Sequence, residues 1–119
     1  MKKVLIVDDS LTVRMYHKQL LNRDGYECEE AENGMEALEK SQIKNYDLYV
    51  VDINMPVMDG YTFVKKLREE NKTTPVIMVS TESEAKDKNL GYKSGATIYI
   101  VKPANPKQLS FMAKILTKE

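Results

Sequence analysis

Side chains capable of chemistry follow four separate apolar runs of this 119-residue chain. They are Asp8 and Asp9 after the first run, Asp52 after the second, Ser80 and Thr81 after the third, and Lys102 after the fourth. An aspartate that follows a strand commonly caps the next helix, so each aspartate taken alone has an ordinary structural explanation. Because all these residues stand at the end of a run, the pattern favours one shared site.

The chemistry that this set could perform is phosphoryl transfer assisted by a metal ion. Three carboxylates packed together repel one another, which raises their pKa values unless a cation intervenes. Mg²⁺ suits the set, because it prefers hard oxygen ligands and often combines one or two carboxylates with waters and a phosphate oxygen. Asp52 stands alone at a strand end and is the candidate nucleophile, since a carboxylate can form an aspartyl phosphate. The adjacent Asp8 and Asp9 are better arranged to hold the metal, and a carbonyl of the following irregular loop, best that of Asn54, could turn toward it.

The apolar runs themselves predict the strands that position these residues. Four runs read as strands buried on both faces, at residues 4–7, 48–51, 76–79 and 98–101. Residues 26–29 alternate between apolar and polar side chains, which is typical of a half-covered strand at a sheet edge. We therefore expect five strands, with the reactive residues at their carboxyl ends.

Segments with helical spacing lie between the predicted strands. They cover residues 11–21, 35–43 and 84–94, the segment of Phe63, Val64 and Leu67, and the segment of Leu109, Met112, Ala113 and Leu116. Asn33, Asp59 and Asn105 are placed to cap three of these helices. Alternating strands and helices predict a doubly wound α/β fold, with a five-stranded parallel sheet and helices on both faces. In such folds ligands bind beyond the carboxyl ends of the strands.

Bulk composition predicts one domain over residues 1–119, inside the cytoplasm. Eighteen basic and eighteen acidic residues cancel, so no global field draws the chain to nucleic acid or an anionic membrane. Cys28 is the single cysteine and cannot form an internal disulfide, which favours a reducing compartment. No apolar run approaches the ~20 residues that span a bilayer. Met35, Met78 and Met112 stand at positions typical of core residues.

Four motifs of the chain resemble the response-regulator receiver family, particularly its single-domain chemotaxis members. They are VLIVDDS at 4–10, VDINMPVMDG at 51–60, MVST at 78–81 and IVKP at 100–103. The resemblance implies a flavodoxin-like fold with strand order 2-1-3-4-5. It makes Asp52 the phosphoacceptor, Asp9 a direct Mg²⁺ ligand, Asp8 a ligand through water and Asn54 a ligand through its main-chain carbonyl. Ser80 and Lys102 would contact the phosphoryl oxygens.

The same resemblance implies a switch and two kinds of partner. Tyr99 would turn inward when the hydroxyl of Ser80 moves toward the phosphoryl group, with Thr81 beside it, and Asn54 and Glu82 would tune the lifetime of the phosphorylated state. A histidine kinase would supply the phosphoryl group, and a target protein would bind the fourth helix, fifth strand and fifth helix. The protein would act as a monomer that promotes only its own phosphorylation and dephosphorylation. Two further features follow the last predicted strand. Ala104 stands where many members of the family have Phe, and the Lys102-Pro103 peptide bond is a candidate for the cis form.

Other functions fit the residues less well. Phosphatases with an aspartyl-phosphate intermediate place an acid two residues after the nucleophile, where this chain has Asn54. A flavin phosphate would meet the negative charges of Asp8 and Asp9. DNA binding is not expected, because no helix is left over after the α/β unit is built, and an output through another protein follows. A phosphorelay intermediate, a phosphate sink and a docking domain that works without phosphorylation remain as alternatives.

Overall fold

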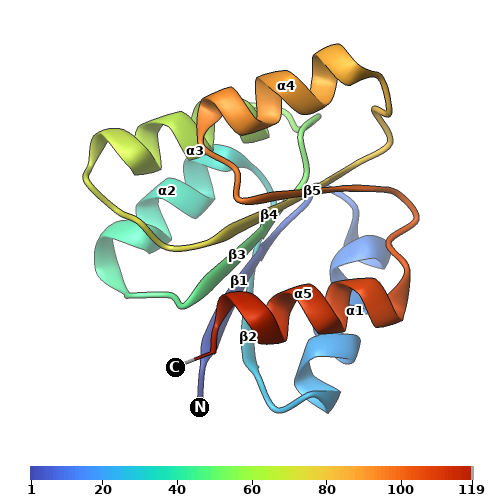
Figure 1. Cartoon of the computed structure of the whole chain (residues 1–119). Coiled ribbons are helices and arrows are strands. Elements are labelled where there is room, and N and C mark those ends of the chain that lie inside the picture. Colours follow the sequence, from blue (N-terminus) through green and yellow to red (C-terminus); the bar gives the residue numbers. More distant parts are fainter. Residues whose placement is uncertain (119) are drawn as a thin grey trace.

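A five-stranded parallel sheet forms the centre of the computed structural model, which describes residues 1–118 (Figure 1). The strands are β1 (Lys3–Val7), β2 (Glu27–Ala31), β3 (Leu48–Val51), β4 (Val76–Ser80) and β5 (Ile98–Val101). Their order is β2-β1-β3-β4-β5, and every pairing is parallel. The predicted strand order and the edge position of the second strand are confirmed. The second strand itself lies slightly later than the 26–29 prediction, and β4 extends to include Ser80.

Five helices cover the two faces of the sheet. They are α1 (Leu11–Arg23), α2 (Gly34–Ile43), α3 (Gly60–Glu69), α4 (Ala85–Ser94) and α5 (Pro106–Leu116). In Figure 1, α1 and α5 lie on one side of the sheet and α2, α3 and α4 on the other. Two hydrophobic cores follow from this arrangement: Leu20 and Leu109 belong to the first side, whereas Phe63 and Leu67 belong to the second.

Side chains cap the helices where the sequence predicts caps. Asn33 accepts a hydrogen bond from the Glu36 amide, and Asp59 accepts one from the Thr62 amide. The Asn105 side chain accepts hydrogen bonds at the start of α5, where Pro106 is the first helical residue. Each cap satisfies amide groups that have no partner inside the helix. The loops that precede these helices are therefore fixed in direction.

The helix α4 is held to the domain by little buried surface. Gly91 is its single buried residue among those described, and the ring of Tyr99 lies directly beneath that glycine.

The prediction that Met35 is a core residue is wrong, because this side chain is 40% exposed on the first turn of α2. Met78 is fully buried and Met112 packs against a core, as predicted. None of the helices over residues 1–118 has the length and apolar character that crossing a membrane requires.

Candidate functional site

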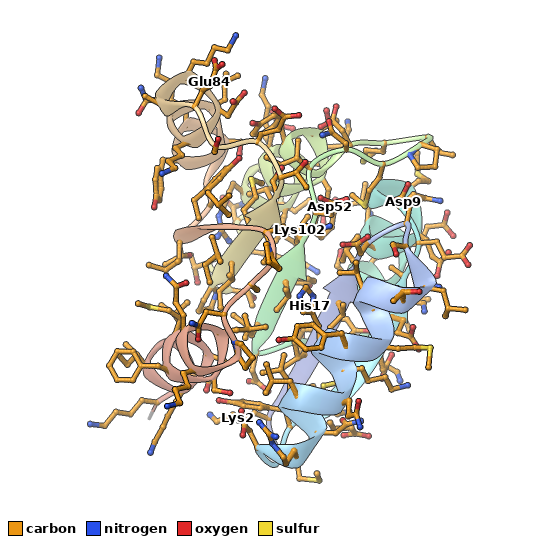
Figure 2. The ribbon with its side chains drawn as sticks, turned by 90° about the vertical axis from the view of Figure 1, so that its right-hand side faces the viewer. Lys2, Asp9, His17, Asp52, Glu84 and Lys102 are labelled. Carbon is orange, nitrogen blue, oxygen red and sulfur yellow. The ribbon has the colours of Figure 1, made fainter. Side chains whose placement is uncertain are left out.

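The carboxyl ends of β1 and β3 bring three aspartates together. Val7 and Val51 are aligned in the sheet, and the amide of Asp52 donates to the Val7 carbonyl at 2.8 Å. The strands therefore end side by side. Carboxylate oxygens of Asp8, Asp9 and Asp52 lie within 4.8 Å of one another. Figure 2 shows Asp9, Asp52 and Lys102 at the same end of the sheet, while Lys2 lies at the opposite end.

Asp8 is a buried carboxylate whose polar atoms all have partners. The ammonium group of Lys102 donates to Oδ2 at 2.8 Å, and the Ser10 amide donates to Oδ1 at 2.9 Å. The main-chain amide of Asp8 donates to the Ala31 carbonyl at 3.1 Å, and its carbonyl accepts a hydrogen bond from Arg14. With this many contacts Asp8 is fixed, whereas Asp9 is exposed at the mouth of the site.

Asp52, which directly follows β3, is a second buried carboxylate of the site. Burial, followed by the charge of Asp8, raises the pKa of Asp52 to about 6. Lys102 lies 3.4 Å from Oδ1 of Asp52 and offsets part of that effect. For Lys102, burial lowers the pKa, but the hydrogen bond to Asp8 and the attraction of both carboxylates together raise it. Lys102 therefore stays charged, and three carboxylates with one ammonium leave an excess of negative charge for a cation to balance.

The loop after Asp52 is fixed by two glycines. A Cβ on Gly60 would lie 2.1 Å from the carbonyl oxygen of Asp52, so the first turn of α3 can pack on this backbone only with glycine. The Gly60 amide donates to the Ile53 carbonyl, and the Gly34 amide of α2 donates to the Met58 carbonyl. Asn54 lies in this loop, exposed at the mouth of the site.

Glu82 connects three residues that the sequence singled out. Its amide donates to the Ser80 hydroxyl at 3.1 Å, its carbonyl accepts from the Tyr99 hydroxyl at 2.7 Å, and its carboxylate accepts from the Asn54 amide group at 3.2 Å. The Tyr99 ring is buried between β5 and α4. Burial raises the pKa of Tyr99, which keeps its hydroxyl protonated and able to donate. Thr81 is outside this network and exposed beside Lys102.

A small pocket adjoins the acidic site on the α1 side. It has a volume of about 300 Å³ and is lined by Val13, Tyr16, His17, Thr81, Lys102, Pro103 and Ala104. Ala104 is buried in the core of α1 and α5, and the Lys102-Pro103 peptide bond is cis, as expected. His17 is buried, and burial lowers its pKa, so it fills space as a neutral side chain.

Sequence reasoning missed Arg14, which is 6% exposed and reaches the main chain of the site. Its own helix carries no signal that could have found it, because a buried arginine requires nearby carboxylates and only the folded structure brings them to Arg14. Glu30 and Glu32 are those partners, at 3.0 Å and 3.7 Å.

Together, the fold and the site define a doubly wound α/β domain with an acidic pocket, a lysine and a hydroxyl at its carboxyl edge. The sequence pattern of the response regulator receiver domain matches residues 4–114. The chain therefore belongs to the response regulator receiver family, and its fold is the CheY-like form of the flavodoxin fold.

Several relatives resemble this chain over its whole length. The chemotaxis protein CheY4 of Vibrio cholerae is 42% identical, with a TM-score of 0.91 and 98% of each chain covered. The response regulator TrrA of Thermotoga maritima, solved in complex with Mg²⁺ and BeF, is 35% identical, with a TM-score of 0.88 and coverage of 98% and 99%. The transcriptional regulatory protein ResD of Bacillus subtilis is 38% identical over 116 residues, which are 98% of this chain and 48% of ResD. The chain thus spans about half the length of this curated relative.

Proposed function

We propose that this protein is a phosphorylation switch that takes a phosphoryl group from the phosphohistidine of a histidine kinase onto Asp52. The observation that carries the proposal is the placement of the Asp52 carboxylate between a lysine ammonium group and two further aspartates. The chemistry of this site suits Mg²⁺, because hard oxygen donors converge in it with an excess of negative charge. The TrrA complex with Mg²⁺ and BeF supports this assignment by similarity. Asp9 and Asp52 would hold the ion directly, with the Asn54 carbonyl, and Asp8 through water.

The chain's own residues divide the transfer between them. An oxygen of Asp52 bonds to phosphorus as the bond from phosphorus to the imidazole nitrogen breaks, and the electron pair remains on that nitrogen. Lys102 offsets the charge of the equatorial phosphoryl oxygens, and the Ser80 hydroxyl donates a hydrogen bond to one of them. Bound Mg²⁺ supplies further neutralisation of that charge. Because the pKa of Asp52 is about 6, the carboxylate is mostly ionised and nucleophilic above neutral pH.

The signal passes outward through Glu82. When the Ser80 hydroxyl turns to a phosphoryl oxygen, the Glu82 amide loses its acceptor, and the loop between β4 and α4 shifts. Tyr99 follows, because its hydroxyl is bonded to the Glu82 carbonyl. Since Tyr99 is already buried, the expected change lies chiefly in this loop and in α4. The pairing of Asn54 with Glu82 controls the access of water, which sets how quickly the protein dephosphorylates itself.

The output of the switch is the surface of α4, β5 and α5. The 42% identity and the fold shared with the chemotaxis protein CheY4 support a chemotaxis-type output, in which a target protein binds this surface directly. ResD supports a second candidate, in which the same switch controls transcription. Both outputs use the same phosphoryl chemistry in the cytoplasm. A phosphorelay intermediate would need only the transfer site and not the switch.

The test of the switch is an NMR comparison of the protein with and without Mg²⁺ and beryllium fluoride, a phosphoryl mimic. We expect the amide signals of residues 81–84, α4 and β5 to move, and Asp52→Asn to show no such change. Movement confined to the acidic site, with α4 and β5 unchanged, would contradict the proposed output and favour a phosphorelay intermediate.

A further inference from the structure

Arg14 contacts the main chain of the acidic site, at the peptide unit between the two aspartates that follow β1. Its Nη1 donates to the Asp8 carbonyl oxygen at 2.7 Å, inside the protein. This carbonyl belongs to the peptide unit that joins Asp8 to Asp9. Since a peptide unit is planar, a hydrogen bond that fixes its carbonyl also fixes the direction in which the following residue leaves.

Arg14 is held in place by the edge strand. Its Nε donates to Glu30 Oε1 at 3.0 Å, and Lys18 lies 3.3 Å from the other carboxylate oxygen. The hydrogen bond from Arg14, ahead of that from Lys18, holds the pKa of Glu30 below its usual range, so the carboxylate stays charged. Glu32 lies farther away and is mostly exposed, so Glu30 is the partner that orients the guanidinium.

The geometry points to Arg14 as a positioning residue that, held by Glu30, orients the Asp8-Asp9 peptide and so aims Asp9 at the metal ion. Asp8 has its own side-chain partners in Lys102 and Ser10. Asp9 is exposed, and its direction depends on the backbone that carries it. The inference rests on the proposed function, because Arg14 would orient a ligand of the same proposed Mg²⁺ site. Partners that orient metal ligands typically change metal affinity by 10- to 100-fold when they are removed.

The chain offers a matched control in Arg68. This half-buried arginine also donates to main-chain carbonyls, at Gly95, Lys72 and Thr74. Its side chain reaches from α3 to carbonyls that precede β4 and β5, at the amino edge of the sheet and thus away from the aspartates. Loss of either arginine removes side-chain hydrogen bonds to main-chain carbonyls, but only the loss of Arg14 frees the peptide beside Asp9.

The experiment is a Mg²⁺ titration followed by NMR, which reports the Kd and shows that each variant is folded. We expect Arg14→Met to raise the Kd for Mg²⁺ roughly tenfold and Arg68→Met to leave it within about twofold. Arg14→Lys can still donate to the Asp8 carbonyl but lacks the planar fork that also reaches Glu30, so its increase is smaller. Glu30→Gln keeps an acceptor and loses the charge, and we expect a smaller increase there also.

An unchanged Kd in folded Arg14→Met overturns the inference, as does an equal increase in Arg68→Met, which would assign the effect to general destabilisation. The wild-type titration separates this inference from the proposed function. If wild-type protein binds no Mg²⁺, the proposed metal site itself fails. If wild-type protein binds Mg²⁺ and Arg14→Met does so equally well, only the role of Arg14 fails.

Discussion

Asp52 combines burial with a neighbouring negative charge, and both disfavour its ionised form. The pKa of about 6 means that a folded protein without a metal ion carries unfavourable electrostatic energy at neutral pH. Lys102 relieves only part of it, because its shorter contact is with Asp8, at 2.8 Å against 3.4 Å to Asp52. The negative charge that Lys102 does not offset therefore favours the binding of a cation, which the proposed chemistry requires.

Replacing Asp52 by Asn should stabilise the metal-free protein. The folded-state pKa lies above the ordinary value of 3.8, so the protonated carboxyl favours the folded state. The destabilisation by Asp52 is therefore present above about pH 6 and disappears as the pH falls toward 4. We expect Asp52→Asn to raise the free energy of unfolding by roughly 1–3 kcal/mol at neutral pH, with little difference near pH 4.

Urea unfolding in the presence of a chelator, measured from pH 4 to pH 8, tests this prediction. Glu39→Gln, which removes an exposed carboxylate on α2, serves as the control and should follow wild-type protein throughout. A constant difference between Asp52→Asn and wild-type protein over the whole pH range would contradict the electrostatic origin of the effect.

The sequence predicts which side chains of the site come together, but it does not predict the role of a residue that acts through the backbone. Asp8, Asp52 and Lys102 end predicted strands, so the parallel fold brings them into contact. Arg14 is part of an ordinary amphipathic helix, and nothing local distinguishes it from a solvated arginine. Its partner Glu30 belongs to a neighbouring strand, and that pairing appears only in three dimensions.

Of the five helices, α4 has the fewest buried residues, and it packs directly on the ring of Tyr99. A Cβ on Gly91 would lie 2.9 Å from the Tyr99 ring and 3.2 Å from the sulfur of Met78. A glycine inside a helix is ordinarily unfavourable by about 1 kcal/mol relative to alanine, so its presence here is explained by the ring below it. Sequence periodicity predicted this helix, but it could not predict that its one buried residue would be a glycine.

Gly91→Ala should therefore displace Tyr99 instead of simply stabilising α4. We expect the Tyr99 hydroxyl to lose its hydrogen bond with the Glu82 carbonyl, and the variant to gain less stability than the ~1 kcal/mol that helix propensity alone would give. A crystal structure and urea unfolding measure the two effects. Asn89→Ala, at an exposed position of the same helix, is the control, because it changes propensity without touching the ring. A full gain in stability with Tyr99 unmoved would show that the contact imposes no constraint.

The molecule as a whole assembles its site from strand ends that are distant in the sequence. Asp8, Asp52 and Lys102 meet only when the parallel sheet is formed, and the Lys102 amide then donates to the Ser80 carbonyl. The alternation of buried runs and helical spacing predicted the fold class, and the strand order came from the family resemblance. Periodicity could not place the ends of β2 and β4, since the edge strand is polar and Ser80 is buried without being apolar.

Because the aspartates separate on unfolding, Mg²⁺ should stabilise the folded protein. A ligand that binds only the folded state adds about 2.7 kcal/mol when its concentration is one hundred times the Kd. We expect the thermal midpoint of wild-type protein to rise with added Mg²⁺ and to return when the ion is chelated. Asp9→Asn should weaken this response, whereas the exposed Glu39→Gln should not. A midpoint that Mg²⁺ leaves unchanged would contradict the metal site.

The central claim is that Asp52 accepts a phosphoryl group, and its most direct test is the intact mass of the protein after incubation with acetyl phosphate and Mg²⁺. We predict a single labile phosphate on wild-type protein, no adduct when the metal is chelated, and none on Asp52→Asn. Equal labelling of Asp52→Asn, or no adduct on wild-type protein with an active donor, would contradict the mechanism and favour a docking function without phosphorylation.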